Sequence, residues 1–242
     1  MKKLEIENLS FSYRIGNPVL SNISFQAAEN EAIGLIGANG VGKSTLLKLL
    51  VGLVSGFQGS LRMNGMEINK KNLTKIRKQV GYVFQDSDSQ LFLSTVYEDV
   101  AFGPENYGYS RKEVQQRTME ALQKVHMEKL KDSQVYRLSG GQKKLASIAT
   151  ILSLQPEMIL LDEPTIALDP QNRRNIIRII KEMEGTRIIA THDLDMVLDT
   201  CERTILLSHG QIVKDGDTEA ILTDRELLEE NGLELPLSLY RK

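Results

Sequence analysis

Residues 37–45, with the sequence GANGVGKST, fit the pattern G-x-x-x-x-G-K-[ST]. Glycines let the backbone curl until several N–H groups face one point, and the N-terminus of a following helix adds partial positive charge there. This arrangement suits the β- and γ-phosphates of a nucleotide. We expect Lys43 to neutralise the phosphate oxygens and the Ser44 hydroxyl to hold Mg²⁺. The loop residues predicted to bind are Gly37, Asn39, Gly40, Gly42, Lys43, Ser44 and Thr45.

Two adjacent carboxylates, Asp162 and Glu163, follow the apolar run MILL and precede Pro164. A carboxylate at the end of a core strand can reach Mg²⁺ directly or through water, and we expect this of Asp162. Glu163 would then point at the γ-phosphate and polarise the attacking water as a general base. A pair of surface charges is the alternative, but it does not suit a position directly behind a buried strand.

Two further polar residues end predicted strands. Gln85 follows VGYVF, and its amide can both donate and accept, so it can contact Mg²⁺ or the attacking water. His192, in IIATHD, is a candidate to contact the γ-phosphate and to hold the water and Glu163 in position. His126 and His209 have no such context and are expected to be ordinary surface or core residues.

A second glycine turn, LSGGQKKL at residues 138–145, begins another predicted helix. It has the composition of a phosphate-binding turn, although the chain already carries one far upstream. Tyr13, in LSFSYRIGNP, could supply the flat apolar face that an adenine ring needs. It could equally be an aromatic residue packed in a sheet.

Strand and helix patterns alternate along most of the chain. The N-terminal part contains the β-type runs LEIENLSFSY, NISFQA and SLRMNG, with Asn64-Gly65 as a turn. The runs EAIGLIG, VGYVFQ, EMILLD, TRIIATHD and RTILLS are predicted to be buried parallel strands. Helices are predicted at residues 43–53, 111–126, 142–154, 171–184 and 194–201. This alternation indicates an α/β fold whose mostly parallel sheet is covered on both faces.

We expect one domain over residues 1–242. Residues 1–85 and 155–215 would form a β-lobe and an α/β core, and residues 86–154 an inserted helical subdomain. Residues 216–242 would form a C-terminal helical tail, with no substantial regulatory domain behind it.

Composition excludes several classes of partner. The 242 residues include 41% hydrophobic and 26% charged residues, a mixture typical of soluble globular proteins. The formal net charge of −2 gives no electrostatic reason to expect nucleic acid or an anionic lipid surface as the main partner. The single cysteine, Cys201, fits a reducing cytoplasm. No apolar run approaches the roughly 20 residues that span a bilayer, so another chain would have to hold this one at a membrane.

Together these residues resemble the nucleotide-binding subunit of an ATP-binding cassette (ABC) transporter. The motifs occur in the family's order: Tyr13 at the adenine-stacking position, residues 37–45 as Walker A, Gln85 as the Q-loop glutamine, LSGGQ as the signature, MILLDEP as Walker B, ALDP as the D-loop and His192 as the switch histidine. The resemblance implies ATPase activity with ATP and Mg²⁺. It also implies an α/β P-loop NTPase core with a mostly parallel sheet, an N-terminal antiparallel β subdomain and an inserted α-helical subdomain.

The resemblance also gives the second glycine turn a role. Subunits of this family pair head to tail, so each LSGGQ loop faces the γ-phosphate held by the partner's Walker A. A second ATPase subunit, identical or related, is therefore an implied partner. The residues implied to bind ATP across this interface are Ser139, Gly140, Gly141 and Gln142.

A narrower resemblance lies in residues 82–108, in THDLDMVLDTCERTILLSHGQIVKDG and in LLEENGLELP. These segments look like the cassettes of energy-coupling-factor transporters, which import vitamins or transition-metal ions such as cobalt and nickel. In that group a membrane-embedded coupling subunit inserts helices beside the Q-loop, and a separate membrane protein captures the substrate. The resemblance implies both partners and a peripheral position at the cytoplasmic face of the cell membrane.

Two positions depart from the family pattern. Leu145 stands where an arginine is common, after Lys143 and Lys144, and Ile166 stands where a small or polar residue is more usual. These departures leave open how the signature helix and the D-loop pack.

Two alternative functions remain. The first is a soluble ABC-type ATPase such as an iron–sulfur assembly scaffold ATPase. The second is a nucleotide-binding module without hydrolysis, which conflicts with the presence of Glu163 and His192.

Overall fold

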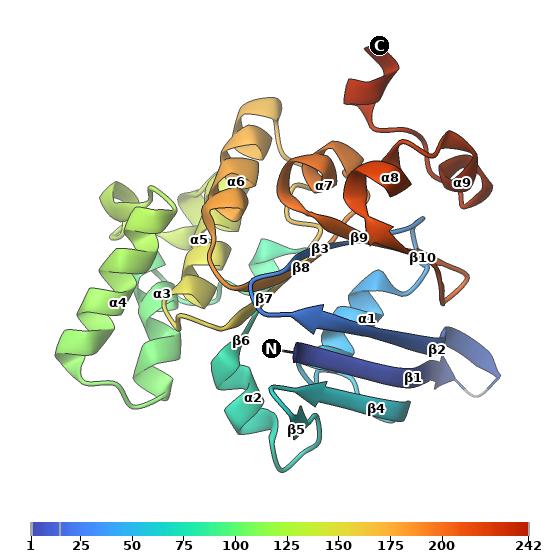
Figure 1. Cartoon of the computed structure of the whole chain (residues 1–242). Coiled ribbons are helices and arrows are strands. Elements are labelled where there is room, and N and C mark those ends of the chain that lie inside the picture. The colour runs from blue at the N-terminus through green and yellow to red at the C-terminus, as the bar shows by residue number, and fades with distance from the viewer. Residues whose placement is uncertain (1, 15, 242) are drawn as a thin grey trace.

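Two β-sheets form the centre of the molecule in the computed structural model, which describes residues 2–14 and 16–241 (Figure 1). The antiparallel sheet has the order β2-β1-β4-β5, made of β1 (Lys2–Arg14), β2 (Asn17–Ala28), β4 (Gln58–Met63) and β5 (Met66–Glu67). The second sheet has the order β10-β9-β3-β8-β7-β6, made of β3 (Ala32–Ile36), β6 (Val80–Val83), β7 (Met158–Asp162), β8 (Thr186–Ala190), β9 (Arg203–Ser208) and β10 (Gln211–Asp217). It is parallel except for the edge strand β10.

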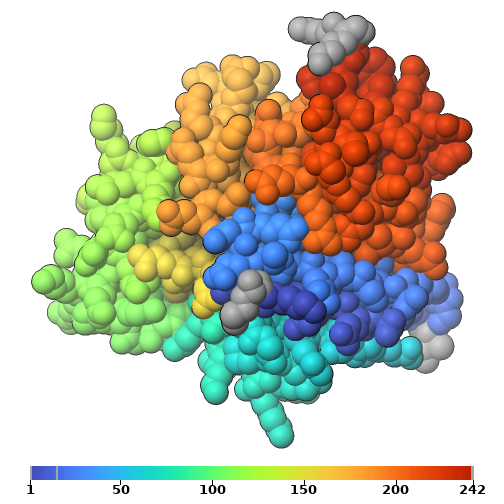
Figure 2. All heavy atoms as spheres, viewed as in Figure 1, coloured from blue at the N-terminus to red at the C-terminus, as the bar shows by residue number. Residues whose placement is uncertain are grey.

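The helices divide into a group around the sheets and a group at one end. The helices are α1 (Lys43–Leu50), α2 (Leu73–Gln79), α3 (Val96–Asn106), α4 (Arg111–Lys124), α5 (Gly140–Leu152), α6 (Pro170–Glu182), α7 (Leu194–Thr200), α8 (Thr218–Leu222) and α9 (Arg225–Glu230). Figure 1 shows α3, α4 and α5 gathered at one end, with α6, α7 and α8 along one face of the parallel sheet. In the space-filling view this helical end and the C-terminal residues form opposite sides of the molecule (Figure 2). The predicted α/β fold is confirmed.

The parallel strands are buried on both faces and contribute side chains to two apolar cores. Along β7, Ile159 and Leu161 pack in a core with the helices α3 to α7, while Leu160 packs in a core against the antiparallel sheet and α1. Because side chains alternate along a strand, a continuous apolar run supplies both cores at once. None of the helices in residues 2–14 and 16–241 is both long and apolar enough to cross a membrane.

Several helices begin or end at residues other than those predicted, and interactions or backbone conformations at their ends explain the differences. α5 begins two residues earlier than predicted, because Ser139 and Gln142 form a reciprocal capping box at its start. α4 ends at Lys124, and His126 just beyond it has a φ of 58°, a left-handed conformation that a helix cannot continue through.

The elements that were not predicted individually include α2, α3 and β10. α3 begins with a capping box between Thr95 and Glu98 but carries Pro104 inside it, which disguises a helix in the sequence. β10 is an edge strand with mostly exposed residues, so it has no apolar run to reveal it.

Substitution of Gly81 in β6 tests the packing of the parallel sheet against α5. A Cβ at this position would overlap the Cγ2 atom of Ile151. We expect Gly81→Ala to lower the free energy of unfolding by about 1–3 kcal/mol through overpacking. Gly216→Ala is the matched control, because a Cβ there would have only Ile221 Cδ1 within 4 Å, at 3.9 Å. Denaturant unfolding measures both, and equal stabilities would contradict this account of the contact.

Candidate nucleotide-binding site

The glycine loop joins the carboxyl end of β3 to the start of α1. Gly42 is the residue before α1 and has a φ of 108°, and Gly40 has a φ of 82°; both conformations favour glycine. A Cβ at Gly40 would meet nothing within 4 Å, so the loop leaves open space on that side. The turn therefore exposes backbone at the N-terminus of a helix, where anions bind.

Lys43 is folded over this loop. Its ammonium donates hydrogen bonds to Gly37 O at 2.6 Å and to Ala38 O at 3.1 Å, and the residue is 6% exposed. Burial lowers the pKa of Lys43 below its ordinary value, while Glu163 and Asp162 act in the opposite direction. Carbonyl dipoles compensate a buried ammonium only in part, so the position favours a bound anion such as phosphate.

The side chains of Ser44 in α1 and Asp162 in β7 are in contact. Ser44 Oγ donates to Asp162 Oδ1 at 2.8 Å, and Tyr82 OH donates to Asp162 Oδ2 at 2.9 Å. Burial and the neighbouring Asp162 carboxylate raise the pKa of Tyr82, which keeps the phenol a donor. Mg²⁺ prefers oxygen ligands, and it usually takes one or two from protein and the rest from water and phosphate. The hydroxyl and carboxylate oxygens of Ser44 and Asp162 fit that requirement.

Glu163 and His192 are also in contact. His192 Nδ1 lies 2.8 Å from Glu163 Oε2, which also accepts hydrogen bonds from Thr191 Oγ1 at 3.1 Å and His192 N at 3.3 Å. The Glu163 side chain is buried, whereas that of His192 is 51% exposed. Glu163 has a φ of 46°, which is costly for a residue with a side chain and is typical of functional positions.

An ion pair behind His192 was not predicted from the sequence. Arg173, in the first turn of α6, donates to both oxygens of Asp193 at 2.6 Å, and Thr165 Oγ1 donates to Asp193 Oδ2 at 3.0 Å. Burial opposes ionisation of Asp193, but these hydrogen bonds outweigh it and lower its pKa. The pair fixes the residue next to His192 against the helix that follows the D-loop.

Gln85 lines a cleft of about 550 Å³ beyond the end of β6. Asp162, Gly140 and Ala167 also line it, so residues from Walker B, the signature and the D-loop border one space. Lys144, which the sequence analysis did not assign a role, reaches this region from α5. Its ammonium donates to Phe84 O at 2.9 Å and to Gln85 O at 2.7 Å. Burial lowers the pKa of Lys144 to about 8.

The LSGGQ turn caps α5. Gln142 N donates to Ser139 Oγ at 3.3 Å, and Ser139 N donates to Gln142 Oε1 at 2.9 Å. Ser139 and Gly140 are exposed, while a Cβ at Gly141 would overlap the side chain of Asn172. Part of the Gln142 side chain is thus engaged in the cap, and the exposed part of the turn is its N-terminal edge.

Tyr13 lies beside the glycine loop. Its hydroxyl is 3.3 Å from Thr45 Oγ1, and the edge of its ring packs against Phe11 with the centroids 4.9 Å apart. The side chain is 58% exposed, which leaves surface for a flat ligand. The role of Tyr13 in adenine stacking stays a prediction.

Most predicted site residues thus share one edge of the parallel sheet, at the carboxyl ends of its strands. The LSGGQ turn is the exception: among the described residues, no hydrogen bond or ion pair joins it to residues 37–45. Within a single chain, therefore, the glycine loop and the LSGGQ turn are not bonded to each other, although Gly140 lines the same cleft as Gln85 and Asp162.

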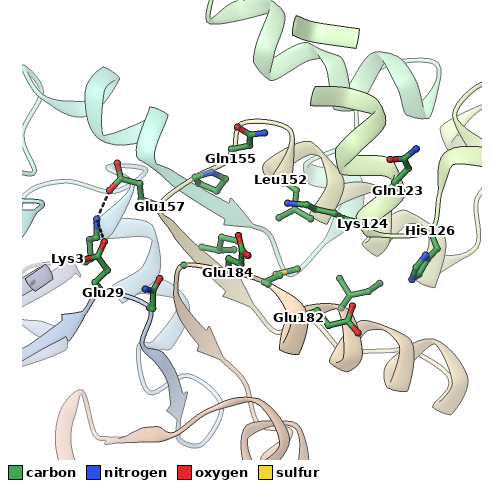
Figure 3. Close-up of a pocket in the computed structure, with 16 residues that line it drawn as sticks. Lys3, Glu29, Gln123, Lys124, His126, Leu152, Gln155, Glu157, Glu182 and Glu184 are labelled. Atoms are coloured by element: carbon green, nitrogen blue, oxygen red, sulfur yellow. Dashed lines mark hydrogen bonds and ion pairs between the residues drawn. The ribbon is translucent and has the colours of Figure 1, made fainter. Parts of the chain in front are cut away.

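A larger cavity, of about 750 Å³, lies elsewhere (Figure 3). It is lined at the amino ends of β7 and β8 by Glu157 and Gly185, and by the C-terminal turns of α4 and α6. Lys3 closes one side through ion pairs with Glu29 at 3.4 Å and Glu157 at 2.7 Å. Ligands of open α/β sheets bind at the carboxyl ends of strands, so this cavity is distinct from the motif residues.

Comparison with known proteins agrees with this geometry. The family described as "ABC transporter" matches residues 20–166. This chain belongs to the ABC transporter family. It is 46% identical to an energy-coupling factor transporter ATP-binding protein, EcfA, from Carboxydothermus hydrogenoformans, over 97% of this chain and 87% of that protein. A putative ABC transporter ATP-binding protein from Gloeobacter violaceus is 44% identical over the full length of both.

A solved structure shows the same fold. The cbiO1 protein of Clostridium perfringens, described as part of the ABC transporter complex cbiONQ, aligns with a TM-score of 0.85 and 34% identity over 95% of this chain and 94% of that one. The chain therefore has the ABC ATPase fold with its antiparallel N-terminal sheet and helical insertion. As a member of this family, it is an ATP-binding protein and an ATPase.

Removal of the Lys43 ammonium tests the phosphate site. We expect Lys43→Ala to weaken ATP binding at least about tenfold, because the loop loses its one buried cation. Lys75→Ala, at an exposed lysine in α2, is the control and should bind as the original chain does. Titration with a fluorescent ATP analogue measures both, and undiminished affinity of Lys43→Ala would remove Lys43 from this role.

Proposed function

We propose that this chain is the ATP-hydrolysing subunit of an energy-coupling-factor type transporter. The transporter would import a transition-metal ion, cobalt or nickel, or a vitamin. The observation that carries the ATPase part is the contact between Glu163 and His192 beside the Ser44–Asp162 pair. The relatives named above support the transporter type.

The proposed chemistry follows from the residues at the strand ends. Backbone N–H groups of the glycine loop and Lys43 hold the phosphates of ATP. Ser44, Asp162 and Gln85 would hold Mg²⁺, which supplies charge neutralisation at the phosphates when bound. Among the described residues, the hydrogen bonds to the carboxylate of Glu163 all end on Oε2, so Oε1 remains to take a proton from the attacking water. His192 keeps that carboxylate oriented.

The proposal includes a head-to-tail dimer. Among the described residues, no hydrogen bond or ion pair joins the LSGGQ turn to the glycine loop of its own chain, and its N–H groups lie at the start of a 13-residue helix. Placed against the Walker A site of a second subunit, Ser139, Gly140 and Gly141 would complete that ATP site. ATP would then favour the closed dimer, and hydrolysis would release it.

An exposed aromatic surface beside the Q-loop supports a membrane partner. Phe92 and Phe102 are 63% and 40% exposed, with ring centroids 4.9 Å apart. Tyr136, 70% exposed, lines a hollow of about 330 Å³ together with Phe92. Aromatic residues are enriched in the cores of protein interfaces. This surface would receive helices of the coupling subunit at the cytoplasmic face of the membrane, and a separate membrane protein would capture the substrate.

The soluble alternative has less support. None of the relatives reported above has a name that refers to iron–sulfur assembly. An exposed aromatic surface next to the Q-loop also suits a protein partner better than a free surface.

Replacement of the proposed base tests the ATPase mechanism. We expect Glu163→Gln to keep ATP binding, because the amide retains the side-chain volume, and to lower kcat at least about 100-fold through loss of the proton acceptor. ATP should then trap a closed dimer, which light scattering detects as a doubled mass. Hydrolysis at the original rate would show that Glu163 is not the base.

Isolation of the chain from detergent-solubilised native membranes tests the partners. A small coupling subunit and a substrate-capture protein should copurify and be identified by mass spectrometry. Phe92→Glu should lose both, because a charge in an apolar interface is costly to bury. Leu237→Glu, at another exposed apolar residue, is the control and should keep them. Copurification of a conventional permease, or of soluble proteins only, would refute the energy-coupling-factor assignment and leave the ATPase assignment intact.

A further inference from the structure

The signature helix α5 is attached to the Q-loop segment, residues 84–90, by side-chain hydrogen bonds. Gln90 Nε2 donates to Ser147 O and to Thr150 Oγ1, each at 2.8 Å. The Oε1 atom of Gln90 accepts from Phe84 N at 3.0 Å. The segment that follows β6 is therefore held along the middle of α5.

Lys144 contacts the backbone of the Q-loop glutamine itself. It is 3% exposed, and its ammonium donates to the carbonyl oxygens of Phe84 and Gln85 at 2.9 and 2.7 Å. Asp162 and Asp86 are the acidic groups that act on it. A buried ammonium that donates to two consecutive carbonyls fixes the backbone at Gln85, because loss of either bond would leave polar groups unpaired.

Lys143 and Leu145, the neighbours of Lys144 on α5, make different contacts. Lys143 forms an ion pair with Asp88 at 2.6 Å, and the Asp88 side chain is 67% exposed. Leu145, which replaces the arginine common in the family, is 6% exposed and packs in the apolar core. The buried positive charge of this helix turn thus comes from Lys144.

We propose that Lys144 is a positioning residue that couples the Q-loop glutamine of this subunit to its own signature turn. The proposal rests on the head-to-tail dimer described above. In that dimer Gln85 serves the ATP site of its own chain, whereas Ser139 to Gly141 serve the site of the partner. Within one chain, Lys144 joins α5 to Gln85 itself through the hydrogen bond to Gln85 O.

The spacing of residues along α5 explains how a shift at Gln85 would be transmitted to the signature turn. Lys144 lies four residues after Gly140, so the two lie one above the other on the same side of the helix. A helix moves as a stiff unit, so a shift of the Gln85 backbone that preserves both hydrogen bonds also shifts the signature turn. Occupancy of one ATP site would thereby change the geometry offered to the other.

Hydrogen exchange tests the positioning without nucleotide. In the nucleotide-free chain, Lys144→Met should speed amide exchange in residues 84–90 by at least about tenfold, because the loop loses the anchor of its carbonyls. Lys144→Arg keeps two donors and should restore part of the protection. Lys143→Met is the control, because its partner Asp88 is 67% exposed, and should change exchange little. Unchanged exchange in Lys144→Met would overturn the proposal.

Mixed dimers test the coupling. A Lys43→Ala chain keeps its signature but loses its own ATP site, and a Ser139→Arg chain does the reverse. A mixture of the two should recover one working site, made of the Ser139→Arg chain's glycine loop and the Lys43→Ala chain's LSGGQ turn. This reference pair does not involve Lys144, so failure to recover activity would refute the head-to-tail pairing itself, and the coupling with it.

Lys144→Met is then placed in one chain of the working pair at a time. We expect either placement to lower kcat about tenfold with the KM for ATP changed less than about twofold, because geometry rather than ground-state binding is lost. Lys144→Arg should recover part of kcat in both placements. A loss confined to the chain that holds ATP would reduce Lys144 to local support of the Q-loop, and no loss in either chain would remove it altogether. Both results would overturn the coupling.

Discussion

The parallel register of β3, β8 and β7 is the constraint on which the whole site depends. Ala190 at the end of β8 pairs with Leu35 on one side and with Asp162 on the other, so three strands end at one level. These strands are buried on both faces, and a slip by one residue would exchange the side chains of the two cores. The glycine loop, the two carboxylates and His192 each lie at or just beyond the end of one of these strands, so the register brings them together.

Buried charges at this edge are held in place before any nucleotide arrives. Lys43, Asp162 and Glu163 are each at most 6% exposed, and each has at least one short hydrogen bond within the chain. Such groups are costly to bury unless they are paired, so their partners fix their positions. The left-handed backbone at Glu163 is maintained by the same packing. The result is a site whose electrostatics are arranged in advance, which is how enzymes stabilise developing charge.

The helix α5 connects this rigid edge to surfaces that other chains would contact. The LSGGQ turn lies at its N-terminus, and its middle residues bind the Q-loop segment. The exposed aromatic pair Phe92 and Phe102 follows the Q-loop segment in the chain. In the proposed transporter, a small movement of α5 would therefore reach an ATP site, a partner subunit and a docking surface. A nucleotide-dependent closure would in this way perform work on the proposed membrane partner.

The sequence by itself determined the fold class, most of the strands along the chain and the residues predicted to form the ATP site. It could do so because glycine loops, buried apolar runs and capping residues are local features with local causes. Only the tertiary structure revealed the Arg173–Asp193 pair, the bond from Tyr82 to Asp162 and the place of Lys144. Their partners lie 20, 80 and 59 residues away in the chain. No local pattern marks such pairs, because it is the packing of helices on the sheet that brings them within hydrogen-bonding distance.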